Sequence, residues 1–258
     1  MRTSVIQKNN ITPFVLIDNR KKSKYTLDGE KKKTHSNKQK GISSRVFAFQ
    51  TTKEIEAMIN VFDEKISLAP DEDKKHIAYR NKLLFLIGMN IGIRGSDLRT
   101  LKWSFFFNKK NGELVWKKSY TILPEKQKKY NKFVTLYFNE TVKKSIGNYI
   151  NKYPINDLDD YVIFSRKGDE PLTVSGLWGI IKQTAKEAEI KQNIGSHSLR
   201  KSWGYWCWHN AKDKNKALVI LQQCFGHSST QVTAKYIGIL DEEIAEMYNS
   251  IELGYEFI

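Results

Sequence analysis

Two histidines, an arginine and a tyrosine near the C-terminal end of the chain have the residue types needed to break a phosphodiester bond without a metal ion. His197 and Arg200 are three positions apart, His227 follows a glycine, and Tyr236 comes nine residues after His227. An arginine can hold an anionic phosphorus centre, imidazoles can accept and donate protons, and a phenol can attack phosphorus. The four side chains therefore predict phosphoryl-transfer chemistry.

A second arginine, Arg94, follows Gly92 at a point where a helix is expected to begin. Free N–H groups and the helix dipole favour an anion at such a position, and a guanidinium adds a planar, bidentate donor. Asp97 is on the same face and could hold the guanidinium or cap the helix. A single arginine near a helix start is also compatible with an ordinary surface salt bridge.

Each of these side chains has a structural alternative when it is considered alone. The helix that begins near His197 is rich in aromatic residues, so His197 and Arg200 could serve packing and hydrogen bonding. Residues 226–228 are typical of a tight turn, and the histidine within them could be a turn residue. Tyr236 is one of twelve tyrosines, most of which are expected to pack.

The hydrophobic pattern predicts helices on both sides of a small sheet. Thr51 and Glu54 form a capping box ahead of apolar residues at helical spacing, and residues 74–90 predict a core helix that ends at Gly92. The later part of the chain predicts helices at residues 141–151, 174–188, 197–209, 214–225, 229–236 and 241–251.

Between these two groups of helices, aromatic and β-branched residues predict strands at positions 103–107, 114–123 and 133–136. The Asn111-Gly112 pair and a lysine-rich turn at residues 126–132 separate them. We therefore expect a mainly α fold with one small three-stranded antiparallel sheet.

Composition limits the class of protein. The 258 residues are 40% apolar and carry 43 Lys+Arg against 28 Asp+Glu, which gives a formal net charge of +15. A substantial core can form, and the excess positive charge suits a polyanionic partner. Ribosomal proteins, nucleases and heparin binders share this charge, so it selects no single function.

The cysteines and the apolar segments bear on the cellular compartment. Cys207 and Cys224 have neither metal-site nor disulfide-framework spacing and are expected to be buried thiols in a reducing compartment. No segment has the length and apolarity of a membrane span, and the N-terminus lacks a signal-peptide core. We expect a cytoplasmic protein.

Residues 20–45 contain ten Lys/Arg, with only Asp28 and Glu30 as acids. Such a segment does not fold by itself. It is either a solvated linker or an arm that follows DNA phosphates. We expect residues 1–45 to be a basic, flexible N-terminal segment and residues 46–258 to form one folded domain.

The order of the candidate residues resembles the tyrosine recombinase family, of the phage integrase type. They occur in the order of that family's motifs: Arg94, a lysine in the hairpin turn, His197-x-x-Arg200, Gly226-His227-Ser228 and Tyr236. Leu98 to Trp103 also matches the Leu-x-x-Leu-x-Trp tail after the first arginine. The resemblance covers residues 51–240 and implies that residues 46–258 have the family's catalytic-domain fold.

The resemblance also implies a role for each residue in cleaving and rejoining double-stranded DNA, without a metal or ATP as cofactor. Arg94 and Arg200 would hold the non-bridging oxygens of the scissile phosphate. Tyr236 would attack phosphorus, leaving a 3′-phosphotyrosyl bond and a free 5′-hydroxyl. His197 would accept a proton near the nucleophile, and His227 would donate to a phosphate oxygen.

In the family a hairpin lysine protonates the departing 5′ oxygen. Lys126 is our first choice for that lysine and Lys128 our second. Gln127 departs from the Lys-Thr or Lys-Gly pair that is usual there. Residues 201–203, Lys-Ser-Trp, depart from the commoner His-Thr-Phe. This second departure concerns packing around the site, and we expect activity to be retained.

Full-length members of the family carry a helical core-binding domain ahead of the catalytic domain, whereas mostly charged residues precede Thr51 here. The chain would then be a minimal catalytic form or a fragment. Without a second domain to close around the duplex, it is expected to bind DNA weakly and with strong salt dependence.

The partners implied by the resemblance are double-stranded DNA, further copies of the chain in a tetramer on DNA, and a directionality factor, with no membrane. Residues 241–251 could pack on their own core or pass to a neighbouring protomer. Two other functions stay open: a DNA-binding regulator of the same fold, and a type IB topoisomerase-like relaxing enzyme. A metal-dependent nuclease is poorly supported, because no carboxylate cluster accompanies the histidines.

Overall fold

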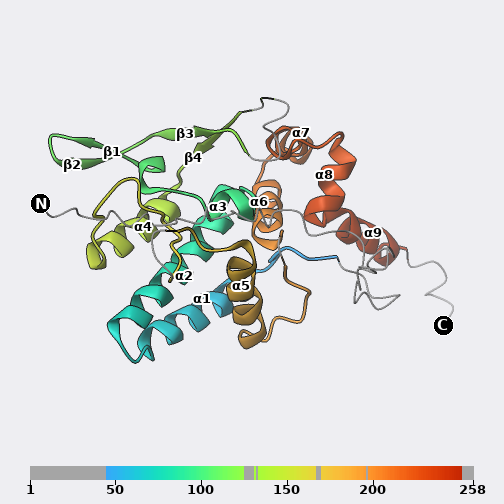
Figure 1. Ribbon diagram of the computed structural model, residues 1–258. Helices are drawn as coiled ribbons and strands as arrows, with labels where there is room; N and C mark the ends of the chain where they lie inside the picture. The colour runs from blue at the N-terminus through green and yellow to red at the C-terminus, as the bar shows by residue number, and fades with distance from the viewer. Residues whose placement is uncertain (1–44, 125–130, 132, 167–169, 196, 252–258) are drawn as a thin grey trace, which may run out of the picture. The chain divides into compact units, whose positions relative to one another are not determined.

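The structure is a computed structural model that describes residues 45–124, 131, 133–166, 170–195 and 197–251, with the backbone alone described at residues 240–243. Figure 1 shows its helices and strands. In chain order these are α1 (Thr52–Ser67), α2 (Glu72–Ile91), α3 (Gly95–Leu98), η1 (Trp103–Phe105), β1 (Phe107–Lys110), β2 (Glu113–Trp116), β3 (Ser119–Ile122), β4 (Val134–Tyr137), α4 (Glu140–Lys152), α5 (Val174–Glu187), α6 (Ser198–His209), α7 (Lys214–Phe225), α8 (Thr230–Ile237) and α9 (Ile239–Asn249). The predicted basic segment, residues 1–45, lies outside the described residues apart from Arg45.

The caps of the first two helices agree with the sequence. The Thr51 hydroxyl accepts from the Glu54 backbone N–H at 3.2 Å, and the Glu54 carboxylate accepts from the Thr51 N–H at 3.1 Å, so the predicted capping box is confirmed. Asp71 caps α2, and Gly92 ends it with a φ of 71°. This left-handed conformation is one that glycine adopts at little cost, and it turns the chain towards Arg94.

The predicted mainly helical fold with small antiparallel pairing is confirmed, but the strands are divided differently from the prediction. Instead of one three-stranded sheet, the described residues form two hairpins, β1 with β2 and β3 with β4. The first hairpin turns at Asn111-Gly112, as predicted, with φ values of 52° and 85°. One further bond, from the Lys117 N–H to the Phe106 carbonyl at 2.8 Å, follows the last pair of this hairpin. The predicted strand at residues 114–123 is therefore divided between β2, which ends at Trp116, and β3, which begins at Ser119.

The strand predicted at residues 103–107 is mostly the short helix η1. Trp103, Phe105, Phe106 and Phe107 are all buried, so this run has no exposed alternate face of the kind that a half-buried strand requires. Its backbone hydrogen bonds include one to a loop outside the predicted sheet: the Trp103 N–H donates to the Asp160 carbonyl at 3.1 Å. The aromatic run therefore joins the core as a compact turn.

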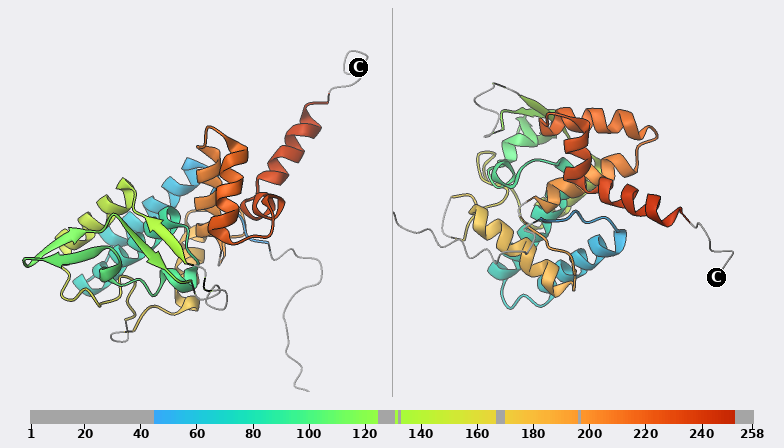
Figure 2. Two further views of the ribbon diagram at one scale, coloured as in Figure 1. Left: turned by 90° about the horizontal axis from the view of Figure 1, so that it is seen from above. Right: turned by 90° about the vertical axis from the view of Figure 1, so that its right-hand side faces the viewer.

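Helix α6 lies between two hydrophobic clusters. The main cluster contains the buried apolar residues of α1, α2, α4 and α5 and those of residues 98–107, and it includes Leu199 of α6. The small cluster consists of Ala48, Tyr205, Leu221, Phe225, Ala234, Ile237 and Ile239. Figure 2 shows α6, α7 and α8 grouped beside the larger part of the fold. Helix α6 therefore connects the two clusters.

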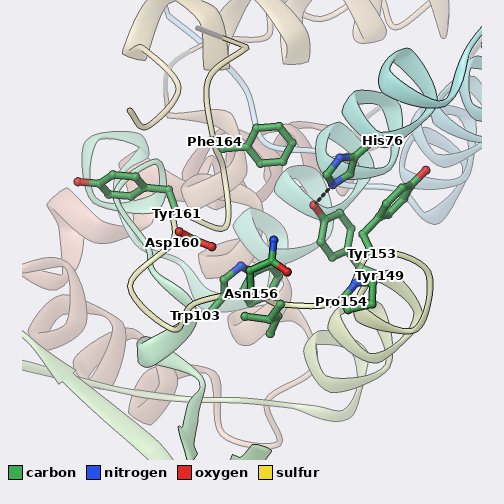
Figure 3. Close-up of a pocket in the computed structure, with 10 residues that line it drawn as sticks. His76, Trp103, Tyr149, Tyr153, Pro154, Asn156, Asp160, Tyr161 and Phe164 are labelled. Atoms are coloured by element: carbon green, nitrogen blue, oxygen red, sulfur yellow. Dashed lines mark hydrogen bonds between the residues drawn. The ribbon is translucent and has the colours of Figure 1, made fainter. Parts of the chain in front are cut away.

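A pocket of about 240 Å³ is lined mainly by aromatic residues of α2, α4 and the loop after α4 (Figure 3). His76 Nε2 lies 2.7 Å from the Tyr149 hydroxyl, and the His76 ring stacks on that of Tyr153 with the centroids 3.9 Å apart. The Tyr153 hydroxyl in turn donates to Glu72. These contacts join α2 to α4, and none of the predicted catalytic residues that the structure describes lines this pocket.

The cysteines are free thiols, and the prediction that both are buried is wrong for Cys207, which is exposed. Cys207 is on a part of α6 that faces neither cluster, whereas Cys224 is half-buried near the end of α7. Among the described residues, no helix combines the length and apolarity needed to cross a membrane. In the same residues no group of three or more His, Cys, Asp or Glu is placed to hold a metal ion.

Candidate active site

Arg200 is buried where the ends of α2 and α7 meet α6, with 8% of its surface exposed. Its Nη1 donates to the Gly92 carbonyl at 2.5 Å, its Nη2 donates to the Cys224 carbonyl at 3.4 Å, and its guanidinium lies 4.5 Å from the centre of the Phe225 ring. A Cβ at Gly92 would lie 2.2 Å from the Trp203 ring. Glycine is therefore required both for the turn and for the close packing of the Trp203 ring against it.

Arg94 is the N-cap residue of α3, as predicted. Helix α3 has only four residues, so its dipole is small and the expected anion attraction rests on the half-buried guanidinium itself. Burial, and after it repulsion from Arg94, lowers the pKa of Arg200 to about 10, which leaves Arg200 charged at neutral pH. The repulsion between the two guanidinium groups decreases when both contact the same anion.

Tyr236 on α8 faces His197 at the start of α6. Its hydroxyl lies 3.2 Å from His197 Nδ1, within hydrogen-bond distance. Burial raises the pKa of the Tyr236 phenol above its ordinary value of 10.0, whereas Arg200 and Arg94 act in the opposite direction. The phenol is therefore protonated at neutral pH, and an imidazole nitrogen lies within hydrogen-bond distance of it.

His227, in the turn between α7 and α8, lies on another side of Tyr236, with the two ring centroids 5.0 Å apart. Its Nδ1 is 3.0 Å from the Thr233 hydroxyl, which itself donates to the Ser229 carbonyl. Nδ1 therefore carries the proton of the neutral ring, and Nε2 is left as an acceptor. Burial, followed by Arg200 and Arg94, lowers the pKa of His227, so this neutral form dominates at neutral pH.

A pocket of about 400 Å³ opens beside the two arginines. Arg94, Asp97 and Arg200 line one part of it, and Trp203, the end of α2 and residues of β3, β4 and α7 are among its other lining residues. Pro124, the last described residue before the lysine-rich turn, also lines it. Lys126 and Lys128, the two candidates for the general acid, lie outside the described residues.

The structure thus brings five of the six predicted catalytic residues into one group: Arg94, His197, Arg200, His227 and Tyr236. The sequence prediction missed two neighbours of this group. Phe225 lies under Arg200 and has its ring 5.2 Å from those of both His227 and Tyr236. The ammonium of Lys201 lies 5.1 Å from the centre of the Tyr236 ring. The departure from the usual motif at position 201 was the signal that could have drawn attention to this lysine.

The chain is also similar in sequence to a known protein family and to individual proteins. A family model described as the phage integrase family matches residues 49–243. The probable integrase/recombinase YoeC of Bacillus subtilis (strain 168) is 28% identical over 180 residues, which cover 69% of this chain and 89% of that protein. The tyrosine recombinase XerD of Staphylococcus haemolyticus (strain JCSC1435) is 31% identical over 124 residues, but these cover only 41% of its length.

Solved structures share the fold at lower sequence identity. XerA recombinase aligns with a TM-score of 0.54 and 19% identity over 81% of this chain and 66% of its own. The XerH site-specific recombinase, bound to its palindromic difH substrate in a post-cleavage complex, aligns with a TM-score of 0.51 and 19% identity over 88% of this chain and 60% of its own. Because the family model spans residues 49–243, which hold all six predicted catalytic positions, the chain belongs to the phage integrase family of tyrosine recombinases.

Proposed function

We propose that this chain cleaves and rejoins DNA strands at specific sites through a 3′-phosphotyrosyl intermediate. The observation that carries the proposal is the Tyr236 hydroxyl 3.2 Å from His197 Nδ1, in a group that also holds two charged arginines. The reaction needs a nucleophile, a proton acceptor and positive charge at one phosphate. These three requirements are met by side chains of the chain itself, so the proposed reaction uses neither a metal ion nor ATP.

In the proposed step the Tyr236 oxygen forms a bond to phosphorus while the bond from phosphorus to the 5′ oxygen breaks. The phenol proton passes to His197 Nδ1, and Arg94 and Arg200 bind the non-bridging oxygens as negative charge increases on them. One phosphodiester is exchanged for another, so attack by a 5′-hydroxyl reverses the step and rejoins DNA.

The 5′ oxygen must take up a proton as it leaves, and we assign this to a lysine of the turn after β3. Lys126 follows Pro124 by two residues, and Pro124 lines the pocket beside the arginines. Lys128 is the second choice for the same role.

His227 has a different proposed role, because its neutral ring has a lone pair on Nε2. To donate to a phosphate oxygen it must take up a second proton. The nearby arginines oppose this in the free protein, but the negative charge of a bound phosphate favours it. We therefore propose that His227 becomes a donor only when DNA is bound.

Double-stranded DNA is the proposed partner, supported by the net charge of +15 and by the paired arginines. We propose assembly as a tetramer on DNA, with a directionality factor as a further partner. Helix α9 supports contact between copies, because Ile244, Met247 and Tyr248 are 45%, 68% and 77% exposed. Removing the residues after Leu240 should then reduce recombination more than cleavage of a single strand.

The test is trapping of the covalent intermediate. The protein is incubated in EDTA with a library of nicked duplexes whose central segment is randomised, and adducts are recovered from a denaturing gel and sequenced. We expect an adduct with a defined sequence for the wild type and none for Tyr236→Phe. Tyr248→Phe is the matched control, because it removes an exposed hydroxyl from α9.

Other outcomes separate the remaining functions. DNA binding without an adduct would support a DNA-binding regulator and contradict the proposal. An adduct without any sequence preference, with relaxation of supercoiled plasmid, would support a topoisomerase-like enzyme.

A further inference from the structure

Lys201 is a buried lysine next to the proposed nucleophile, with 9% of its surface exposed. Its Nζ donates to the Val46 carbonyl at 2.8 Å and lies 5.1 Å from the centre of the Tyr236 ring. Moving an ammonium group out of water costs free energy unless neighbouring groups replace its contacts with water. A carbonyl and the face of an aromatic ring each provide partial negative charge to it.

The Val46 carbonyl belongs to the extended segment of residues 45–50, which precedes α1 and lies against α6. Three α6 side chains hold this segment through hydrogen bonds. Besides Lys201, the Ser202 hydroxyl accepts from the Phe49 N–H at 2.7 Å, and Trp206 Nε1 donates to the Phe49 carbonyl at 2.9 Å. The segment is therefore fixed to the helix that carries Arg200.

Tyr236 belongs to α8, and several groups surround its ring. His197 meets the hydroxyl, whereas Phe225 and His227 pack with ring centroids 5.2 Å and 5.0 Å away. A pocket of about 220 Å³ reaches Lys201 and Tyr236 together and is bounded by residues 45–48 and by the turn after α8. Lys201 thus connects three parts of the chain at this ring: the extended segment, α6 and α8.

We propose that Lys201 is a positioning residue for Tyr236, which holds the phenol ring in place by bridging it to the Val46 carbonyl. The Lys201 ammonium lies over the ring and donates to the Val46 carbonyl, so it is not assigned a proton transfer. Displacing a reacting group by 1 Å can cost roughly 100-fold in rate. This inference rests on the proposed function for the effect on rate, but the placement of the ring can be measured without DNA.

Three variants separate positioning from simple support of the fold. Lys201→Met keeps the length of the side chain and removes its charge, whereas Lys201→Arg keeps a cation that can reach both partners. Ser202→Ala is the matched control, because it loosens the same extended segment at Phe49 without touching Tyr236. The nicked duplex enriched by the trapping experiment serves as the DNA probe.

The measurements are the single-turnover rate of adduct formation and the Kd for the nicked duplex. We expect Lys201→Met to form the adduct about 10 to 100 times more slowly with little change in Kd, and Lys201→Arg to stay within about threefold of the wild type. Ser202→Ala should also stay within about threefold. An unchanged rate in Lys201→Met, or an equal loss in Ser202→Ala, would overturn the proposal.

A second readout keeps the test independent of catalysis. In protein labelled with 3-fluorotyrosine, the fluorine resonance of Tyr236 is identified by its loss in Tyr236→Phe. It should shift or broaden in Lys201→Met and remain in place in Ser202→Ala. A resonance that does not move in Lys201→Met would contradict the inference even if no adduct formed. Absence of an adduct in the wild type would instead contradict the proposed function alone.

Discussion

The two clusters on either side of α6 differ in size and in the catalytic residues that they support. The main cluster packs α2, whose C-terminal turn leads into Arg94, and it buries many large side chains, Phe62, Leu84 and Phe85 among them. The small cluster, with seven buried residues, supports Tyr236 through Phe225 and Ile237. Arg94 thus follows a helix of the main cluster, Arg200 lies between the two clusters with its guanidinium on Phe225, and the proposed nucleophile rests on the small cluster.

This difference suggests how the site opens. Regions with little buried apolar surface open at lower free energy than large cores do. Helix α8 has eight residues and ends at Gly238, whose φ is 95°. We therefore expect α7 and α8 to open, with loss of the Arg200 contacts to Cys224 and Phe225, while α1, α2 and the turn that leads to Arg94 stay folded.

The largest expected effect comes from Phe85→Ala in the main cluster. Phe85 is fully buried, and its ring lies 5.7 Å and 5.6 Å from those of Phe49 and Phe62. Losing the ring leaves a cavity, and the free energy of unfolding should fall by about 3 to 5 kcal/mol. Urea denaturation followed by tryptophan fluorescence measures it, with Leu68→Ala as a control because Leu68 is 72% exposed. A loss below about 1 kcal/mol would show that this site collapses without a cavity.

Phe225→Ala tests the small cluster in the same way. Phe225 is 1% exposed and contacts Arg200, His227 and Tyr236. We expect hydrogen exchange to accelerate in α7 and α8 while the amides of α2 keep their protection, and adduct formation to be lost. If the amides of both regions lost protection equally, the two clusters would form one cooperative unit and the comparison would fail.

A matched pair of glycines gives a smaller effect. A Cβ at Gly88 would lie 2.5 Å from Leu199 Cδ1 in the main cluster, and one at Gly204 would lie 2.6 Å from Phe225 Cζ in the small cluster. Each change to alanine should cost about 1 to 3 kcal/mol through overpacking. Only Gly204→Ala should slow adduct formation strongly, because the added methyl group displaces Phe225, against which Tyr236 packs.

Gly147→Ala is the control for this pair, because no atom lies within 4 Å of the position of its Cβ. It lies inside α4, where alanine favours the helix over glycine, so the free energy of unfolding should rise by about 0.5 to 1 kcal/mol. Thermal unfolding of the three variants checks the order. A destabilised Gly147→Ala would mean that the cost of the other two changes is not specific to overpacking.

Local signals in the sequence predicted much of this fold. The capping box at Thr51, the turn at Asn111-Gly112 and the helix at residues 214–225 depend on neighbours in the chain, and all three are confirmed. The run at residues 103–107 failed, because burial on all sides removes the alternation that distinguishes a strand. The division into two hairpins depends on which strands pair, β1 with β2 and β3 with β4, and no local pattern encodes this choice.

The residues of the site also include some that the sequence predicted and some that it did not. The spacing of His197 and Arg200 places both at the start of α6, and the order of the motifs pointed to Arg94, His227 and Tyr236. The contacts of Lys201 could not be predicted, because its acceptor at Val46 is 155 residues away in the chain. Cys207 was misplaced for a related reason: its aromatic neighbours on α6 mark a buried helix but not which of its faces is covered.

The smallest expected effect is a pH dependence of the free energy of unfolding. It arises from His76 beside the main cluster and from His227 beside the small one. Burial lowers the pKa of both imidazoles from the ordinary 6.5, with Arg80 adding to it at His76 and Arg200 and Arg94 at His227. Below pH 6.5 the unfolded chain therefore binds more protons than the folded one, and the free energy of unfolding should decrease as pH falls from 6.5 towards the lowered pKa values. Above this window the contribution is constant.

Each histidine should act on its own region. In hydrogen exchange, His227→Gln should remove the part of the pH dependence seen in α7 and α8, and His76→Gln the part seen in α2 and α4. The Gln side chain keeps a polar group near the Thr233 or Tyr149 hydroxyl but has no proton to gain in this range. If His76→Gln changed the pH dependence of exchange in α8 as much as that in α2, protonation in one region would change the stability of the other. The helix α6 would then couple the clusters rather than separate them.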